Sequence, residues 1–299
     1  MESYKLGTTV ILPTFVLPSR QNEICTESGI DSLKDCLDKN YFKSYPYTVE
    51  YNYNSRGFRD TEWPSNFAEL KNSIWCVGDS FTVGLGSPIE HTWPYILQKQ
   101  TNTRTINVSM DGASNYWISR KALQIIKEID PLAVVVHWSY LFRGEDSDTT
   151  KTDEERRKHI DKSIFGDENE TDKFIKILQQ FKNTKVIHSF IPGFTDSSRI
   201  GAVALWKQLK GTDWPELPLT RDEFNKLDSS VVAELKNFFN KHKKFIDHYN
   251  FIEQYNNLGL DYAVPEFEKI DLSRDSHHYD KITATAFVDQ LLSLTVFPR

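Results

Sequence analysis

The stretch Cys76-Val77-Gly78-Asp79-Ser80-Phe81-Thr82 decides the fold, because it ends one predicted strand and begins a helix. The residues before Gly78, Ser73 to Val77, form a short and mostly apolar run, typical of a strand covered on both faces. Ser80 then lies where the carboxyl end of this strand turns into a helix. In open parallel sheets this edge binds ligands, and a helix N-terminus offers free backbone N–H groups to negative charge. Ser80 is therefore a candidate nucleophile if a base can reach it.

A candidate base lies near the other end of the chain, in Arg274-Asp275-Ser276-His277-His278-Tyr279-Asp280. Asp275 and His278 are three residues apart, so one turn of backbone can bring the carboxylate to the imidazole. A serine hydroxyl is a weak nucleophile until a base accepts its proton, and the base needs a partner that fixes its tautomer. Ser80, His278 and Asp275 supply these three roles. His277 could be the base instead, but only His278 has the three-residue spacing.

Further short apolar runs predict three more strands, with helical patterns between them: Thr105–Val108, Ala133–His137 and Lys185–Phe190. Strands that alternate with helices predict an α/β fold with a parallel sheet and helices on both faces. The ends of the first three strands would bring Ser80, Gly112 and Ser139 to one rim of the sheet. An amphipathic helix closes the chain, and its apolar face is predicted to be Ala284, Phe287, Val288 and Leu291.

On these motifs the chain resembles the SGNH/GDSL hydrolase superfamily, from about Asn54 to the C-terminus. The first family block matches Gly78-Asp79-Ser80, the second matches Asn107–Ser114 with the family's glycine at Gly112, and the last matches Asp275–His278. The third block, normally Gly-x-Asn-Asp after the next strand, is absent, because that strand runs into Trp138-Ser139-Tyr140. The resemblance implies a flavodoxin-like α/β/α fold with a central parallel sheet of about five strands.

The resemblance also implies an oxyanion hole made by the nucleophile's N–H, the second-block glycine N–H and the third-block asparagine side chain. Ser80 and Gly112 can supply the two backbone donors. Ser139 is the substitute at the position of the missing asparagine, with His137 and Asn115 behind it. Loss of one such donor can cost roughly 2.7–4 kcal/mol of transition-state stabilisation. Either the reaction is slow or the third donor comes from elsewhere.

Each of these residues also has a purely structural interpretation. Ser80 could cap its helix, because serine is a favoured N-cap, and Gly112 could serve only a turn that needs positive φ. Asp79 suits a turn or a cap better than a second catalytic acid. His137, at a strand end, suits a hydrogen-bonded histidine at the edge of the core. Taken together, Ser80, Gly112 and the Asp-x-x-His pattern favour the catalytic interpretation.

Composition limits the other possibilities. A net charge of −6 argues against general nucleic-acid binding, which needs a basic face. The three cysteines have no paired spacing and the chain lacks His-Glu-x-x-His, so we expect no metal, and the reaction needs no organic cofactor. No apolar run approaches the roughly 20 residues of a membrane span, and the start lacks a convincing secretory signal. A cytoplasmic or other non-secreted location is expected, and a virion is possible.

The chain is predicted to consist of an N-terminal extension, residues 1–65, and an SGNH-hydrolase-like domain, residues 66–299, with insertions at about 143–172 and 195–250. In the extension a strict alternation predicts a strand with one aromatic face, carried by Tyr45, Tyr47, Val49, Tyr51 and Tyr53. This strand could form a wall on which sugars stack, but a strand laid on the main domain is favoured.

The two insertions have different compositions. The first is dense in charged residues, which is typical of a solvated face or a mobile loop, although its position after the third strand also suits a lid. The second is predicted to carry a helix that shapes a substrate pocket or covers the sheet, with an apolar face of Val231, Leu235, Phe238 and Phe245.

The family resemblance implies a serine esterase that acts on a small-molecule or glycan ester. Ser80 would attack the carbonyl, His278 would accept its proton, and Asp275 would orient the imidazole. An acetyl group on a carbohydrate or similar polar molecule is the expected substrate. Two alternatives stay open: an O-acyltransferase that uses the same triad, and a non-catalytic binding or structural protein of a virion or envelope. The oligomeric state does not follow from the sequence.

Overall fold

The computed structural model describes residues 4–6, 9–11, 15–140, 143–146, 148, 150–159, 170–182, 184, 186–192, 230, 258, 260 and 269–294. At its centre is a parallel sheet with the strand order β10-β7-β5-β6, formed by β5 (Ile74–Gly78), β6 (Thr105–Ser109), β7 (Ala133–Trp138) and β10 (Val186–Phe190). Counted along the chain, this is the flavodoxin-like order 2-1-3-4, in which ligands bind where the winding reverses, between the first and third strands. Four of the about five expected strands therefore lie in the described part of the chain.

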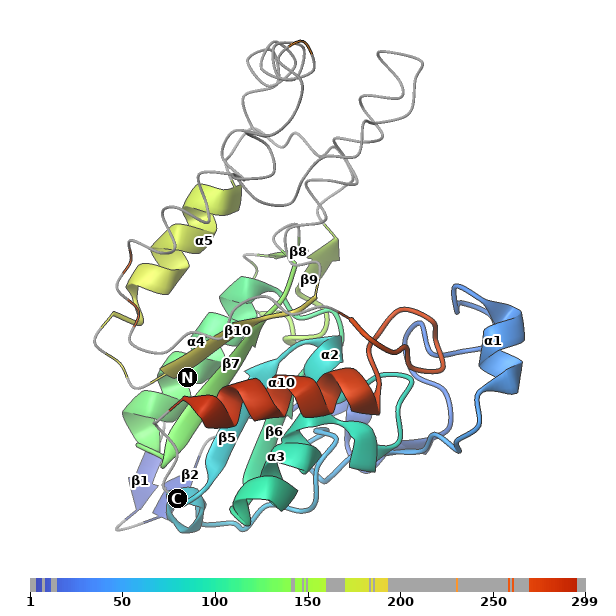
Figure 1. Cartoon of the computed structure of the whole chain (residues 1–299). Helices are drawn as coiled ribbons and strands as arrows, with labels where there is room; N and C mark the ends of the chain where they lie inside the picture. Colours follow the sequence, from blue (N-terminus) through green and yellow to red (C-terminus); the bar gives the residue numbers. More distant parts are fainter. Residues whose placement is uncertain are drawn as a thin grey trace.

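Helices cover both faces of the sheet (Figure 1). On one face α3 (Trp93–Thr101) packs against α10 (Lys281–Ser293), and on the other α4 (Asn115–Glu128) packs against α5 (Glu170–Gln179). The predicted α/β/α fold class is confirmed. The predicted apolar face of the last helix is also confirmed, because four of its side chains have no exposed surface: Ala284, Phe287, Val288 and Leu291.

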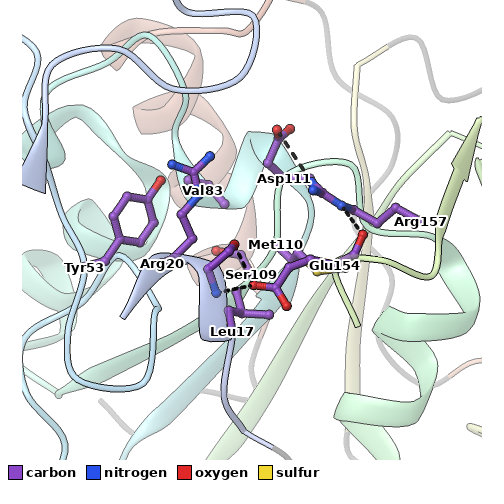
Figure 2. A pocket seen from close by; sticks show the side chains of 10 residues that line it. Leu17, Arg20, Tyr53, Val83, Ser109, Met110, Asp111, Glu154 and Arg157 are labelled. Atoms are coloured by element: carbon purple, nitrogen blue, oxygen red, sulfur yellow. Dashed lines mark hydrogen bonds and ion pairs between the residues drawn. The ribbon is translucent and has the colours of Figure 1, made fainter. Parts of the chain in front are cut away.

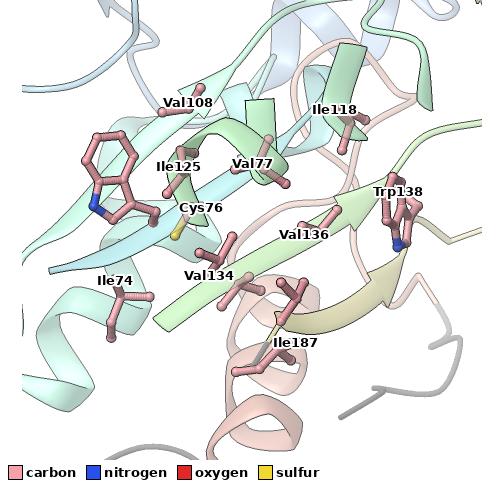
Figure 3. Packing of buried hydrophobic residues seen from close by; sticks show 14 of the residues in the cluster. Ile74, Cys76, Val77, Val108, Ile118, Ile125, Val134, Val136, Trp138 and Ile187 are labelled. Carbon is pink, nitrogen blue, oxygen red and sulfur yellow. The ribbon is translucent and has the colours of Figure 1, made fainter. Parts of the chain in front are cut away.

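The strands are buried along their whole length, as expected of a parallel sheet covered on both faces. Ile118 and Ile125 of α4 belong to the same buried cluster as Val134 and Val136 of β7 and Ile187 of β10 (Figure 3). Burying one such side chain contributes roughly 1.5–3 kcal/mol, so this cluster fixes the sheet on which the rim residues sit.

The remaining elements are short and surround the sheet. Two antiparallel pairs precede it, β1 (Tyr4–Leu6) with β2 (Thr9–Ile11) and β3 (Ile24–Cys25) with β4 (Tyr51–Asn52). The short helices are η1 (Pro18–Arg20), α1 (Lys39–Ser44), η2 (Phe67–Leu70), α2 (Ser80–Val83) and η3 (Ile89–His91). No helix among the described residues is long and apolar enough to cross a membrane.

The aromatic strand predicted around Tyr45 to Tyr53 is shorter than expected. Only Tyr51–Asn52 pairs with another strand, because β3 supplies just two partner residues. Tyr47 is 50 % exposed, so the alternating side chains do not form one continuous buried face. The end of the stretch packs against the chain that follows α2, in a cluster of Val49, Tyr51, Tyr53, Val83 and Leu85. This part of the segment lies on the main domain.

The described part of the first insertion contains an antiparallel hairpin, β8 (Arg143–Glu145) with β9 (Arg157–His159). Arg120 of α4 makes a bidentate ion pair with Glu145 and so anchors this hairpin to the helix layer. Apart from Ser230, the second insertion and its predicted helix lie outside the described residues.

Candidate active site

Ser80 is the first residue of α2, directly after the buried strand β5. The turn between them needs glycine at position 78, because a Cβ there would lie 2.1 Å from the Thr82 hydroxyl oxygen. Asp79 is the N-cap, and its Oδ1 accepts the Phe81 N–H at 3.0 Å. Since Asp79 caps the helix, the Ser80 hydroxyl is available to another partner.

That partner is His278. Its Nε2 lies 2.8 Å from Ser80 Oγ, and its Nδ1 lies 2.6 Å from Asp275 Oδ2. A carboxylate can only accept, so Nδ1 carries the proton and Nε2 is left to accept the serine hydroxyl. The His277 ring lies beside that of His278, with 4.9 Å between the ring centroids. The structure therefore brings Ser80, His278 and Asp275 together, and it places His278 rather than His277 against the hydroxyl.

Asp275 is fully buried and holds the histidine loop together. Its Oδ1 accepts the N–H groups of His277 at 2.8 Å and His278 at 2.9 Å, and the Ser273 hydroxyl at 2.9 Å. Burial raises the pKa of Asp275, but the charge of His278 and the hydrogen bonds from His278 and His277 outweigh burial and hold that pKa well below its usual range. The carboxylate therefore stays ionised and can stabilise an imidazolium.

The N-terminal segment, residues 15–65, holds this loop from outside. Arg274 donates from Nε to Asp31 Oδ1 at 2.9 Å and from Nη2 to Asp31 Oδ2 at 2.6 Å. The Tyr51 hydroxyl also donates to Asp31 Oδ2, at 2.6 Å, and Tyr41 donates to the Leu272 carbonyl at 2.8 Å. These contacts of Arg274 are those of a residue that positions the loop.

Two backbone donors are available for an oxyanion. Within the described part of the chain, neither the Ser80 N–H nor the Gly112 N–H donates to another group. Gly112 has a φ of +70°, which L side chains rarely adopt, so the turn needs glycine here. A free N–H and a required turn therefore occur together at this position.

Ser139, the predicted third donor, is engaged elsewhere. Its hydroxyl donates to Asp79 Oδ2 at 2.6 Å, and its N–H donates to Asn115 Oδ1 at 2.8 Å. Asn115 Nδ2 in turn donates to the Ser139 carbonyl at 2.9 Å. Because both donors of Ser139 are used inside the protein, this arrangement argues against Ser139 as an oxyanion donor.

His137 also has internal partners. Its Nδ1 lies 2.8 Å from Ser189 Oγ, and its Nε2 lies 3.2 Å from the Tyr279 hydroxyl. Burial lowers the pKa of His137 to about 3, so the ring is neutral at neutral pH. These contacts are those of the hydrogen-bonded core-edge histidine that its position suggested.

Arg143, the first residue of β8, was not among the residues predicted from the sequence. Its Nη1 donates to Asp79 Oδ2 at 2.5 Å and to Ser139 Oγ at 2.9 Å. The side chain is 10 % exposed and that of Asp79 is 0 % exposed, so this ion pair is buried beside the nucleophile. The available signal was a cation shortly after the third strand, on the rim that also carries Ser80.

Aromatic rings surround the histidine. The Phe81 ring lies 4.5 Å from that of His278 and 6.2 Å from that of Tyr140, and the Tyr140 ring lies 6.4 Å from that of His277. Burial, with the nearby charges of His278, Lys269 and Arg143, lowers the pKa of His277 to about 3. Ser80 is 1 % exposed and His278 2 %, so both residues are shielded from bulk water.

A cavity of about 210 Å³ adjoins the Gly112 turn (Figure 2). It lies between the N-terminal segment, the end of β6 and the β8–β9 hairpin, and its lining does not include the triad. Arg157 donates to the Asp111 carbonyl at 2.5 Å, next to Gly112. Polar side chains dominate the rest of the view, among them Arg20, Tyr53, Asp111 and Glu154.

No model of a protein family matches the chain, and no curated protein is similar to it in sequence. Among solved structures, it is similar to the lipase/acylhydrolase from Enterococcus faecalis, with a TM-score of 0.38 at 11 % identity over 75 % of this chain and 95 % of that one. A family 3 carbohydrate esterase of Clostridium thermocellum gives 0.38 at 12 % identity over 75 % and 95 %. The psychrotrophic esterase EstA of Pseudoalteromonas sp. gives 0.37 at 11 % identity over 74 % and 95 %.

The class of the fold follows from this structure's own geometry. The 2-1-3-4 strand order, the two helix layers and the meeting of the Gly-Asp-Ser turn with the Asp-x-x-His loop make it an SGNH-like α/β/α fold.

Proposed function

We propose that this protein is a serine esterase in which Ser80 is the nucleophile, His278 the base and Asp275 its orienting partner. The observation that carries the proposal is the 2.8 Å contact between Ser80 Oγ and His278 Nε2, completed by Asp275 at Nδ1. Acyl transfer through serine needs a hydroxyl, an imidazole whose Nε2 is free to accept the proton, and an ionised carboxylate, hydrogen-bonded in this order.

The reaction proceeds in two halves. Ser80 Oγ bonds to the ester carbonyl carbon while its proton passes to His278, and the carbonyl oxygen becomes an oxyanion held by the Ser80 and Gly112 N–H groups. When the tetrahedral intermediate collapses, His278 returns the proton to the departing alkoxide and the alcohol leaves. A water molecule then gives a proton to His278 and attacks the acyl-enzyme, which releases the acid and restores Ser80.

We further propose a small acyl group, such as acetyl, on a carbohydrate or similar polar molecule as the substrate. The cavity beside Gly112 supports this choice, because hydroxyl-rich groups fit a lining that offers Arg20, Tyr53 and Glu154. The carboxylate of Glu154 can accept from a sugar hydroxyl, and the guanidinium of Arg20 can donate to one.

One observation favours a second candidate, an O-acyltransferase with the same triad. Ser80 and His278 are almost fully buried, and exclusion of water protects an acyl-enzyme from hydrolysis. A sugar hydroxyl would then replace water in the second half of the reaction. Its sign is turnover that depends on an added acceptor, with slow hydrolysis in its absence.

The test combines p-nitrophenyl acetate turnover with covalent labelling by a serine-directed fluorophosphonate, read by intact mass. We expect one label, lost in Ser80→Ala. Ser189→Ala is the matched control, because Ser189 is equally buried and contacts a histidine, His137, at 2.8 Å. Label and turnover should persist in that variant.

Turnover of p-nitrophenyl acetate measured with and without a methyl glycoside acceptor separates hydrolysis from acyl transfer. A native protein that is neither labelled nor active across pH 5 to 9 would contradict both enzyme proposals and favour the non-catalytic alternative.

A further inference from the structure

We propose that Arg143 supplies the third oxyanion donor of this site, as a guanidinium in place of the asparagine side chain that the resemblance to the SGNH/GDSL superfamily implies. The inference rests on the proposed serine-esterase chemistry and goes beyond it, because it makes a residue of the β8–β9 hairpin stabilise the negative charge of the transition state.

The position of the guanidinium is fixed from two strands. Arg143 Nη1 is held by Asp79 Oδ2 at 2.5 Å and by Ser139 Oγ at 2.9 Å. Asp79 follows β5 and Ser139 follows β7, and these two strands are neighbours in the sheet. The cation therefore lies at the rim between them, and its partner Asp79 directly precedes Ser80 in the chain.

The same side chain keeps unused donors. A guanidinium has five N–H groups, and the contacts to Asp79 and Ser139 use only Nη1. Arg143 Nε is buried and has no acceptor among the described residues. Buried donors in folded proteins nearly always have a partner, so a buried Nε beside the nucleophile indicates an acceptor that arrives with the substrate.

Charge explains why this acceptor is the oxyanion. An ester carbonyl is neutral in the bound substrate and carries a full negative charge in the tetrahedral intermediate. A fixed cationic donor in a site shielded from water stabilises the second state much more than the first. Ser139 cannot do this, because its hydroxyl already donates to Asp79 at 2.6 Å.

The hairpin holds the cation ready. Glu145, two residues from Arg143, pairs with Arg120 of α4, and Arg157 on the opposite strand donates to the Asp111 carbonyl at 2.5 Å. The charged insertion thus contacts the chain next to both backbone donors, Ser80 and Gly112. A donor placed before substrate arrives needs no reorganisation during the reaction.

The competing interpretation is that Arg143 serves only as the counter-ion of Asp79. Two substitutions separate the interpretations. Arg143→Lys keeps a positive charge for Asp79 but removes the planar fork and its Nε donor. Arg143→Met removes both. Lys151→Met is the matched control, because it deletes a cation from the same hairpin whose partner is Asp146, at 2.8 Å.

The measurement is kcat and KM for p-nitrophenyl acetate, with melting curves to verify folding. In Arg143→Met we expect kcat to fall by about 100- to 1,000-fold with KM within about threefold, the effect of losing one oxyanion donor. Arg143→Lys should remain at least about tenfold impaired, and Lys151→Met should stay within about twofold of the native protein. Phosphorylation of Ser80 by diethyl p-nitrophenyl phosphate should slow in parallel.

Four outcomes would overturn the inference. Native kcat in Arg143→Lys would make the residue a counter-ion, and an equal loss in Lys151→Met would make the effect one of hairpin folding. Native kcat in Arg143→Met would remove the role altogether while leaving the esterase proposal in place. An inert native protein would instead remove the esterase proposal, and this inference with it.

Discussion

Two segments outside the sheet hold different members of the site. The N-terminal segment holds the loop that carries the base, through the buried pair of Asp31 with Arg274. The β8–β9 hairpin holds the turn that carries the nucleophile, through the buried pair of Arg143 with Asp79. In the first pair Arg274 makes contact through Nε and Nη2, whereas in the second Arg143 Nε has no acceptor in the described part of the chain. The first contact should therefore set mainly stability and the second mainly rate.

The largest effect concerns the base itself. His278→Ala should lower kcat by about 10⁴-fold or more, because His278 is the one base in contact with the Ser80 hydroxyl among the described residues, while His277→Ala should stay within about tenfold. The comparison is made with p-nitrophenyl acetate on both purified variants. Because His277 and His278 lie in the same loop, the comparison shows which of the two histidines that loop presents to Ser80 as the base.

The reverse pattern, an inactive His277→Ala and an active His278→Ala, would show that the 2.8 Å contact between His278 and Ser80 is not the productive one. Near-ultraviolet circular dichroism on both variants controls for loss of the loop.

The next effect concerns stability. Asp31→Asn should lower the free energy of unfolding by about 3 kcal/mol, because it leaves Arg274, only 13 % exposed, without its ionic partner. Urea denaturation at pH 7 measures this. Lys71→Met is the control, since its ion pair with Asp130 is exposed and should contribute less than about 1 kcal/mol. A kcat loss in folded Asp31→Asn as large as that of Arg143→Met would remove the contrast between the two segments.

The sheet and the contacts among Ser80, His278 and Asp275 could be predicted from the sequence because their signals are local. Each core strand is a short run that includes apolar β-branched residues, and its bounds differ by a residue or so from those expected. Ser80 and His278 stand 198 residues apart, but each sits in a short recognisable pattern at an element end. The rule that strand ends share one rim then places the nucleophile and the oxyanion residues together.

The two supporting pairs could not be predicted, because each depends on a contact without a local pattern. Asp31 and Arg274 are 243 residues apart, and neither stands in a motif. Arg143 lies in a segment whose charges look solvated until β8 pairs with β9. The aromatic strand was predicted too long for a related reason. Alternation describes one strand, whereas its length depends on how much partner strand β3 provides.

Acid should destabilise a third part of the molecule, the sheet itself, in addition to the two supporting segments. His188 of β10 is 1 % exposed, and Trp138 donates to its Nδ1 at 3.1 Å. Burial lowers the pKa of His188 to about 3, whereas an unfolded histidine has a pKa of about 6.5. Between these values the unfolded chain binds a proton that the folded chain does not, so stability falls as pH falls through this window.

At pH 4.5 this histidine should cost about 2 to 3 kcal/mol of stability relative to pH 7. The urea midpoints at pH 4.5 and pH 7 should therefore lie closer together in His188→Gln than in the native protein. The amide oxygen of this variant can still accept from Trp138. Phe181→Leu, which changes a ring 5.5 Å from His188 but no proton, should lower both midpoints alike. Asp275 does not contribute to the difference between pH 7 and pH 4.5, because its lowered pKa matters only below about pH 4. An unchanged pH difference in His188→Gln would mean that His188 does not carry the acid sensitivity, which would then fall to His137 and His277, whose pKa values burial also lowers to about 3.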